Sequence, residues 1–277
     1  MRKIKNCLKR ITPRPLWLIM ANADRVLMKV PYKMDMILHP DKMVYYCPCC
    51  KIRLRSFEQG DFDDYPDYYD LNAFMNVRQD LQCPFCYSWP RHRILGYWSE
   101  GHKDLFKAKR ILYFAPEKSM ITWLYGNYYN CTCADLDGST DIRLDIQNMN
   151  LPNCSYDMII CNHVLEHVDD YRVALSEVYR VLTPGGYFIC SFPMDPRVDL
   201  VDEDRGITDD SERRSRYGQS DHKRMFGMRA DVLLSEAGFE VTVIDGNDCP
   251  SDILPVIGPS KYDMNRLFLC HKRSGQA

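Results

Sequence analysis

Asp157-Met158-Ile159-Ile160-Cys161, followed by an amphipathic segment at 172–182 and a second apolar run at 187–192, is the stretch that decides the fold class. An uninterrupted apolar run of this length is typical of a strand buried on both faces. Residues 172–182 place their apolar side chains on one face of a helix, and Pro184-Gly185-Gly186 is expected to end that helix. This succession predicts two parallel strands joined by a helical crossover.

The same alternation extends in both directions along the chain. We expect further strands at 111–114, 128–134, 143–146, 240–244 and 267–270, and further helices at 91–109 and 231–237. The fold class is therefore α/β, with a doubly wound, mostly parallel sheet of seven strands. Ligands bind such sheets beyond the carboxyl ends of the strands, so the residues that follow each strand form the candidate site.

Length and composition fit one large domain with a small accessory unit. The chain has 277 residues, of which 45% are hydrophobic and 27% charged, and its formal net charge of −2 argues against bulk nucleic-acid binding. No apolar run approaches the roughly 20 residues of a membrane span. We expect three segments, which are a basic and apolar helical arm at 1–40, a cysteine-rich unit at 41–95 and the sheet domain at 96–277.

The arm at 1–40 concentrates positive charge. Two interpretations of it stay open, namely a helix packed on the next domain and an arm that rests on an anionic membrane surface. We expect a cytoplasmic protein, with peripheral contact to the inner face of the membrane under the second interpretation. Residues 1–23 carry no acidic side chain, and their basic residues are Arg2, Lys3, Lys5, Lys9, Arg10 and Arg14.

The cysteines indicate reduced thiols and one metal site. Their number is 13, which is odd, and several lie in apolar runs, so a disulfide framework is not expected. Four of them form two Cys-x-x-Cys pairs, Cys47 with Cys50 and Cys83 with Cys86. Two such pairs make a closed tetrahedral site for structural Zn²⁺. Cys49 is a rival ligand to Cys50, and cysteines that bind no metal are the alternative.

Two segments of the sheet domain resemble the class I S-adenosylmethionine-dependent methyltransferases, and most closely the methyltransferase type 11 subgroup. Residues 155–168, SYDMIICNHVLEHV, resemble that family's fourth strand and following helix. Residues 177–186, EVYRVLTPGG, resemble the helix and turn before its fifth strand. The resemblance covers residues 105–272. It implies a Rossmann-like methyltransferase sheet and S-adenosylmethionine as cofactor, here beside an N-terminal zinc-ribbon-like unit.

The first loop departs from the family pattern. Family members have a glycine-containing turn after the first strand, whereas this chain has Phe114-Ala115-Pro116-Glu117. Ala115 is small and Pro116 fixes a turn, so the cofactor can still approach the backbone. Glu117 is then placed to meet the ammonium group of the cofactor. A turn that no longer binds cofactor is the alternative.

Aspartates follow the next two strands. The resemblance implies that Asp135 accepts from the ribose hydroxyls and that Asp145 accepts from the adenine amino group. Asp137 is the alternative to Asp135, and for each aspartate a solvated turn or a helix cap is the alternative role. The full set expected to bind cofactor is Phe114, Ala115, Pro116, Glu117, Asp135, Leu136, Asp145, Ile146, Asn162 and His163.

Methyl transfer to a hydroxyl group needs aligned reactants and a base that takes the proton. Histidine suits this role because its unperturbed pKa is near ~6.5. His163 and His222 are the catalytic candidates, and His167, one helical turn after His163, is a third. Structural roles are the alternative for each of them, and residue patterns alone do not assign the base.

We expect a methyltransferase that acts on a small polar or glycan-type acceptor, by O-methylation. The first alternative is an RNA methyltransferase whose zinc unit binds RNA, which the acidic residues between the cysteine pairs disfavour. The second is a non-catalytic scaffold that retains the fold. A basic cluster late in the chain is either a solvated surface or a clamp for an acidic acceptor. Its members are Arg213, Arg214, Arg216, Lys223 and Arg224.

Overall fold

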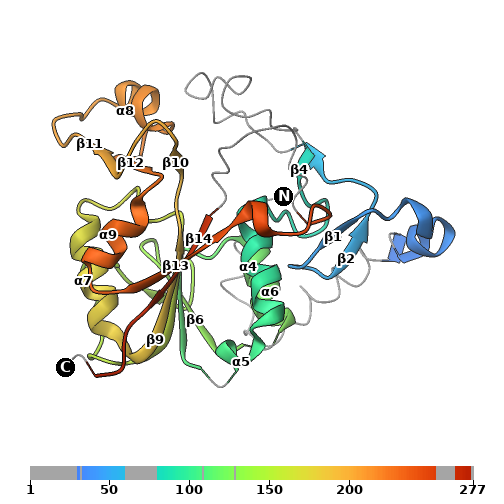
Figure 1. Ribbon diagram of the computed structural model, residues 1–277, viewed down its shortest axis with the longest axis horizontal. Helices are drawn as coiled ribbons and strands as arrows, with labels where there is room; N and C mark the ends of the chain where they lie inside the picture. The colour runs from blue at the N-terminus through green and yellow to red at the C-terminus, as the bar shows by residue number, and fades with distance from the viewer. Residues whose placement is uncertain are drawn as a thin grey trace.

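The computed structural model describes residues 30–31, 33–59, 80–107, 109–127, 129–253 and 266–275. At its centre is a sheet of seven strands (Figure 1). These are β5 (Ile111–Phe114), β6 (Cys131–Asp135), β7 (Ile142–Arg143), β8 (Tyr156–Asn162), β9 (Leu182–Ser191), β13 (Glu240–Asp245) and β14 (Arg266–His271). Their order across the sheet is β13-β14-β9-β8-β5-β6-β7, which confirms the predicted doubly wound, mostly parallel α/β sheet.

The order of the strands creates a switch point between β5 and β8. From β5 the chain winds outward through β6 and β7, and it then returns to the other side of β5 as β8 and β9, with all of these neighbours parallel. Only β14 runs antiparallel to its neighbours β9 and β13. Since ligands bind at such switch points, the loops after β5 and β8 are the ones to inspect.

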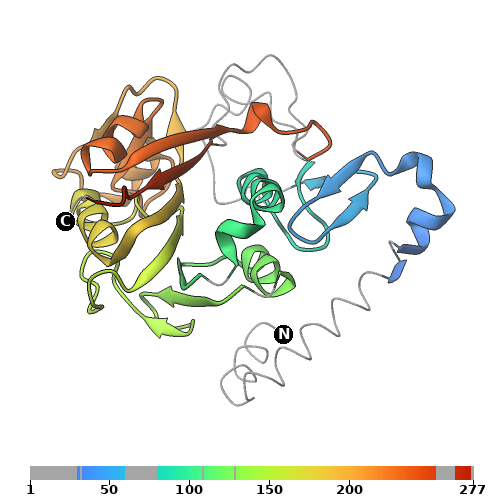
Figure 2. The same ribbon diagram turned by 60° about the horizontal axis from the view of Figure 1, so that its bottom comes forward.

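Helices cover both faces of the sheet (Figures 1 and 2). A hydrophobic core lies on each face of the sheet. Successive residues of β5 pack into opposite cores, because successive side chains of a strand point to opposite faces. Ile111 and Tyr113 pack on the side of α4 and α6, and Leu112 and Phe114 pack on the side of α7 and α9. The helices are α4 (Pro90–Gly101), α5 (Lys103–Phe106), α6 (Lys118–Gly126), α7 (Tyr171–Val181) and α9 (Ala230–Glu236).

Two local predictions around the deciding stretch are wrong. Residues 163–170 form turns rather than a helix. Helix α7 begins at Tyr171, where the Asp170 side chain accepts a hydrogen bond from the Arg172 backbone N–H and so caps it. Pro184-Gly185-Gly186 does not follow the helix as a separate stop, because α7 ends at Val181 and the three residues lie inside β9.

The two glycines build a bulge in β9. Tyr156 pairs with Leu182 and Met158 pairs with Tyr187. The chain therefore advances by two residues in β8 and by five in β9 between these pairs, which is a bulge in β9. Gly185 has a φ of +78°, and a Cβ at Gly186 would lie 2.8 Å from the Thr183 carbonyl oxygen. A side chain at either position would therefore disturb the ladder, which explains why the turn-forming residues belong to a strand here.

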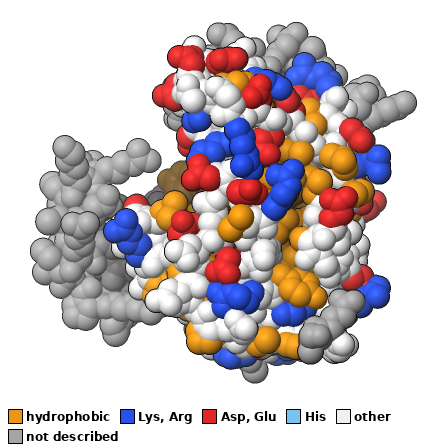
Figure 3. All heavy atoms as spheres, turned by 90° about the vertical axis from the view of Figure 1, so that its left-hand side faces the viewer, with side chains coloured by type: hydrophobic (Ala, Val, Ile, Leu, Met, Phe, Trp, Pro, Cys, Tyr) orange, Lys and Arg blue, Asp and Glu red, His pale blue; other side chains and the backbone are white. Residues whose placement is uncertain are grey.

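A small three-stranded sheet between β9 and α9 was not predicted. Its order is β10-β12-β11, formed by β10 (Met194–Asp195), β11 (Val201–Glu203) and β12 (Arg224–Gly227), and helix α8 (Asp210–Tyr217) packs beside it. Strands of two to four residues leave too little periodicity to detect in the sequence. In the view from this side of the molecule, Lys and Arg side chains are interspersed with Asp and Glu side chains (Figure 3).

The cysteine-rich segment forms two hairpin-like pairs and shares a core with the sheet. β1 (Tyr45–Cys47) pairs with β2 (Ile52–Leu54), and β3 (Glu58–Gln59) pairs with β4 (Asp80–Gln82). Residue 95 lies inside α4, whose Ile94 and Leu95 belong to the same buried cluster as the paired cysteines and the sheet residue Ile111. The cysteine unit is therefore anchored on the sheet domain through α4. Single turns of 3-10 helix complete the elements at η1 (Pro40–Lys42) and η2 (Gly246–Asp248).

Much of the predicted arm lies outside the described residues, which include only 30–31 and 33–40 of it. Residues 33–38 are helical, with Ile37 and Leu38 exposed. The acidic residues between 61 and 70 also lie outside the described part of the chain. Within that part, none of the helices has the length and apolar character needed to cross a bilayer.

Candidate functional site

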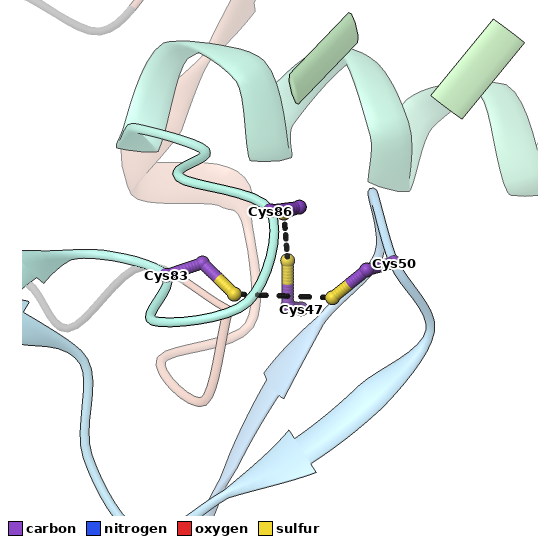
Figure 4. A group of neighbouring side chains, drawn as sticks. All are labelled: Cys47, Cys50, Cys83 and Cys86. Atoms are coloured by element: carbon purple, nitrogen blue, oxygen red, sulfur yellow. Dashed lines mark hydrogen bonds between the residues drawn. The ribbon is translucent and has the colours of Figure 1, made fainter. Parts of the chain in front are cut away.

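The four paired cysteines converge on one point, as Figure 4 shows. The Cys47 and Cys86 sulfurs are 3.6 Å apart, and the Cys50 and Cys83 sulfurs are 3.8 Å apart. All four residues are buried, and their sulfurs lie within 4.8 Å of one another. Zn–S bonds of ~2.3 Å place the sulfurs of a tetrahedral site about 3.8 Å apart. The cluster therefore has the dimensions of a closed site that can bind zinc.

Tertiary packing separates Cys49 from this cluster. The Cys49 thiol donates to the His92 carbonyl oxygen at 3.3 Å. A Cβ on Gly96 would lie 3.2 Å from the Cys49 sulfur, so α4 approaches the first Cys-x-x-Cys turn closely at this glycine. Cys50, not Cys49, belongs to the group of four, as its spacing from Cys47 predicted.

A buried arginine accompanies the cysteine cluster. Arg93 on α4 is fully buried and donates to the carbonyl oxygens of Ser88 and Ile253, each at 2.8 Å. Burial lowers the pKa of Arg93, whereas nearby cysteines including Cys47 and Cys83 act to raise it. Four thiolates around Zn²⁺ carry a net charge of −2, and a guanidinium at this position offsets part of that charge.

The first turn of α4 connects the cysteine cluster to the loop after β5. Glu117 in that loop forms an ion pair with Arg91 at 2.7 Å and a hydrogen bond with the His92 ring. The other His92 ring nitrogen, Nδ1, lies 3.0 Å from the Trp89 backbone N–H and 2.9 Å from the Ser119 hydroxyl, so it accepts and Nε2–H donates to Glu117. The expected contact between Glu117 and the cofactor ammonium stays a prediction.

The two members of this contact have pKa values shifted by their surroundings. Burial lowers the pKa of His92 to about 3, although Glu117 acts in the opposite direction. Burial acts to raise the pKa of Glu117, but Arg91, His92 and His163 together outweigh it, and the pKa falls to about 2. A neutral imidazole and an ionised carboxylate are therefore the forms present near neutral pH.

Neutral His92 makes the stability of the fold depend on pH. Its folded-state pKa of about 3 lies below the ordinary histidine value of 6.5, so between these two values the unfolded chain binds a proton that the folded chain does not. The free energy of unfolding should fall by up to about 1.4 kcal/mol per pH unit as the pH drops from about 6 to 4. Urea titrations at several pH values measure this slope.

His92→Gln should reduce the slope because glutamine does not titrate. The matched control is His102→Gln, which removes an exposed histidine at the end of the same helix and should keep the slope of the unaltered chain. Equal slopes in all three proteins would show that His92 is not the group responsible.

The glycine-free turn after β5 adopts the backbone conformation that glycine favours. Ala115 has a φ of +44°, in the left-handed region, and its N–H donates to the Ala134 carbonyl oxygen at 2.8 Å. His163, which follows β8, has a φ of +53°. Phe114 and Cys161 are paired across β5 and β8, so the two strained residues lie at the same edge, at the switch point. Strained residues that are not glycine are concentrated at functional sites.

The strain at Ala115 predicts a stabilising substitution. A left-handed backbone costs an alanine roughly 1–2 kcal/mol, and glycine avoids this cost. Glycine also increases the entropy of the unfolded chain, which offsets part of the stabilisation. We expect Ala115→Gly to raise the free energy of unfolding by about 0.5–1 kcal/mol in denaturant titrations. Ala134→Gly, at a buried strand position with no such strain, should lower it. Destabilisation by Ala115→Gly would contradict the conformation described for this turn.

The residues expected to bind cofactor lie along one edge of the sheet. Asp135 ends β6 and Asp145 follows β7, and the parallel register of β5, β6 and β7 brings both to the edge that carries Ala115. Each aspartate accepts one backbone N–H, Asp135 from Leu136 at 2.7 Å and Asp145 from Gln147 at 2.8 Å. The second carboxylate oxygen of each has no hydrogen bond with the described residues that would prevent it from binding a ligand.

The remaining members of the set differ in burial. Asn162 is buried, donates to the Tyr113 hydroxyl at 3.0 Å and accepts from Ser191 at 3.0 Å. Ile146 is buried and Leu136 is exposed. This edge of the sheet therefore carries a left-handed turn at Ala115, two aspartate carboxylates and an amide held by two hydrogen bonds.

The three histidine candidates meet around Glu166. His163 Nδ1 lies 3.3 Å from the Glu166 carboxylate, and His167 Nε2 lies 3.9 Å from it. The rings of His167 and His222 stack edge to face, with centroids 4.8 Å apart. His222 is buried, and burial lowers its pKa. Sequence reasoning named the histidines but missed Glu166. The available signal was its position directly before His167 and three residues after His163.

Three of the five members of the predicted basic cluster are paired with acidic side chains. Arg216 forms ion pairs with Asp202 and Asp204, and Arg224 is buried and paired with Glu203. Lys223 pairs with Asp169. Sequence reasoning could not anticipate these acids, because they lie in or beside β11 and in the turns before α7, and reach the basic residues only through the fold.

A comparison with protein families supports the resemblance. Residues 117–190 match the family model described as a methyltransferase domain. This part of the chain is similar to methyltransferase domains. The match includes residues 155–168 and 177–186, whose resemblance it confirms, and it includes the loop after β8.

Similar proteins match parts of the chain. An "Uncharacterized methyltransferase" of Mycobacterium tuberculosis is 40% identical over 45 residues, 16% of this chain and 23% of that protein. A "Probable S-adenosylmethionine-dependent methyltransferase" of Mycolicibacterium smegmatis is 41% identical over 56 residues, 18% of this chain and 22% of that protein. The match therefore spans less than a quarter of either relative. Among solved structures, an S-adenosylmethionine-dependent methyltransferase from Mesorhizobium loti has a TM-score of 0.46 and 17% identity, covering 64% of this chain and 96% of that one.

Proposed function

We propose that the chain is an S-adenosylmethionine-dependent methyltransferase with a structural zinc site, acting on a small polar or glycan-type acceptor by O-methylation. The observation that carries the proposal is the pair of left-handed residues, Ala115 and His163, at the switch point of the sheet, the second of them within the residues that match a methyltransferase domain. Left-handed residues other than glycine are enriched at functional sites. The M. smegmatis relative, described as a probable S-adenosylmethionine-dependent methyltransferase, supports the choice of cofactor.

Specific residues would hold the cofactor. The backbone at Ala115 would lie against its amino-acid part, Asp135 would accept from the ribose hydroxyls, and Asp145 would accept from the adenine amino group beside Ile146. Asn162, fixed by Tyr113 and Ser191, keeps the edge of β8 in place. When bound, the sulfonium supplies an electrophilic methyl group, so the protein mainly aligns donor and acceptor.

His163 is the better placed of the two candidate bases. Its side chain is 28% exposed, whereas His222 is 2% exposed. Glu166 orients the His163 ring through Nδ1, which leaves Nε2 to take the proton from an acceptor hydroxyl. His163 is also close enough to Glu117 to influence the pKa of that carboxyl, which places it near the turn after β5.

The choice of a small or glycan-type acceptor rests on the charged and apolar side chains that lie outside the proposed cofactor site. The basic side chains Arg216, Lys223 and Arg224 are paired with acids, which disfavours a polyanion such as RNA. The exposed apolar residues Ile37 and Leu38 on the arm fit a protein that works beside a membrane surface. Contact of the arm with anionic lipid at the cytoplasmic face is part of the proposal.

Calorimetry with S-adenosylmethionine and with its demethylated product tests the cofactor. We expect saturable binding of both, and absence of binding at about 1 mM ligand would favour a non-catalytic scaffold. An acceptor screen with methyl-labelled cofactor then tests the substrate class, using cell fractions separated into glycan, lipid, RNA and protein. Label in the glycan or small-molecule fraction supports the proposal, and label in RNA alone overturns it.

A further inference from the structure

Glu166 is a buried carboxylate that forms no hydrogen bond with the described residues, although His163 Nδ1 lies 3.3 Å from it. The residue is 1% exposed, and neither of its carboxylate oxygens has a hydrogen-bond partner in the described part of the chain. The side chains that act on its charge are the imidazoles of His163, His167 and His222. Burying a carboxylate costs several kcal/mol unless a cation or hydrogen bonds compensate it. A cluster of imidazoles around such a carboxylate is the donor set of a metal site.

Three residues of this cluster offer ligand atoms toward one point. One atom each from Glu166, His167 and His222 lies within 4.8 Å of the other two. Zn–N and Zn–O bonds of about 2.1 Å bring the ligand atoms of a tetrahedral site to about 3.4 Å from one another, so small side-chain rotations close the site. His167, whose side chain is 34% exposed, is the ligand able to move.

The outer contacts of the two histidines support the same interpretation. His222 Nδ1 lies 2.8 Å from the Tyr217 carbonyl oxygen, so Nδ1–H donates and Nε2 is left with its lone pair. His167 Nδ1 lies 3.3 Å from the Asp221 carboxylate, which orients the other ring nitrogen toward Glu166. Metal-bound histidines characteristically donate their second N–H to a carbonyl or a carboxylate. Both histidines have such an acceptor.

We propose that Glu166, His167 and His222 bind a divalent first-row transition ion, such as zinc, at a site separate from the cysteine cluster. Two imidazoles and one carboxylate leave at least one coordination position open, which distinguishes this site from the closed group of four thiols. The open position takes an oxygen ligand, either water or a hydroxyl of a small molecule. His163 lies beside Glu166 outside the site, with its Nδ1 3.3 Å from the carboxylate, where the second-layer partner of a ligating carboxylate is found.

Cobalt(II) alone is the probe, added to the full chain after zinc has filled the cysteine site. The proposed site predicts one further bound Co²⁺ whose absorption lacks thiolate-to-metal charge transfer. Glu166→Gln and His222→Gln should lower the affinity for this second ion by more than about 100-fold. Asp221→Asn changes an exposed residue that orients a ligand, and should weaken binding by about 10–100-fold without a change in fold.

His271→Asn is the matched control, because it removes a histidine that lies 3.6 Å from the carboxylate of Glu240 in the β13–β14 pair. It should bind the second Co²⁺ as the unaltered chain does. The proposal is overturned if the unaltered chain takes up no second Co²⁺ at about 1 mM, or if uptake persists in both Glu166→Gln and His222→Gln. Because no cofactor or acceptor is added, failure here leaves the proposed methyltransferase function untouched.

Discussion

Cys83→Ser is expected to remove one equivalent of bound zinc and to unfold the cysteine-rich unit. Zinc in a four-thiolate site contributes folding free energy of about 10–16 kcal/mol in peptide systems, and three cysteines with a serine do not reproduce the closed site. Metal analysis of the dialysed protein and thermal unfolding measure the two effects. The midpoint of unfolding should fall by more than about 10 °C, since several kcal/mol are lost.

Cys49→Ser is the matched control for this prediction. Cys49 lies in the same turn and is buried, but its sulfur contacts the His92 carbonyl oxygen rather than the cluster. This variant should keep its zinc and lose no more than about 1–2 kcal/mol of stability. Loss of zinc from Cys49→Ser, or full zinc content in Cys83→Ser, would mean that the ligand set is assigned wrongly.

Loss of the metal should also weaken cofactor binding. The second cysteine pair leads through Trp89 into the first turn of α4, where Arg91 and His92 hold Glu117 in the loop after β5. A chain that has lost this anchor has a less ordered loop, and ordering it on binding costs free energy. Calorimetry on Cys83→Ser should therefore show lower affinity for S-adenosylmethionine than calorimetry on Cys49→Ser.

Asp135→Ala is expected to lower the affinity for S-adenosylmethionine by about 100-fold or more. Hydrogen bonds to a charged group contribute roughly 1.5–3 kcal/mol each, and a tenfold change in affinity corresponds to about 1.4 kcal/mol. Asp135 is proposed to accept from two ribose hydroxyls, so both bonds are lost together. Calorimetric titration with S-adenosylmethionine measures the change, and denaturant unfolding confirms that the variant is folded.

Asp137→Ala decides between the two aspartates that the sequence left open. Asp137 is exposed, and its carboxylate accepts from the Ser139 backbone N–H at 2.7 Å, which makes it a turn residue. We expect its replacement to change cofactor affinity by less than about threefold, a few tenths of a kcal/mol. If Asp137→Ala abolishes binding while Asp135→Ala does not, the ribose site lies two residues further along the chain.

The principal strands could be predicted because their signals are local. The apolar run at 157–161 is long enough to be recognised as a strand buried on both faces, and it became the centre of β8. The cysteine pairs were equally visible, because two thiols on one tight turn can reach one ion whatever the rest of the chain does. The short strands β10, β11 and β12 left no such signal.

The sequence by itself determined the α/β sheet and its seven strands, the two cysteine pairs and the methyltransferase resemblance, because periodicity and motif spacing act within a few residues of the chain. Only the tertiary structure decided which partner each polar side chain has. It turned Cys49 toward His92, paired Glu117 with Arg91, neutralised Arg216 with Asp202, and brought His222 to Glu166. These contacts join residues that are distant in sequence, so they depend on how the helices and loops pack around the sheet.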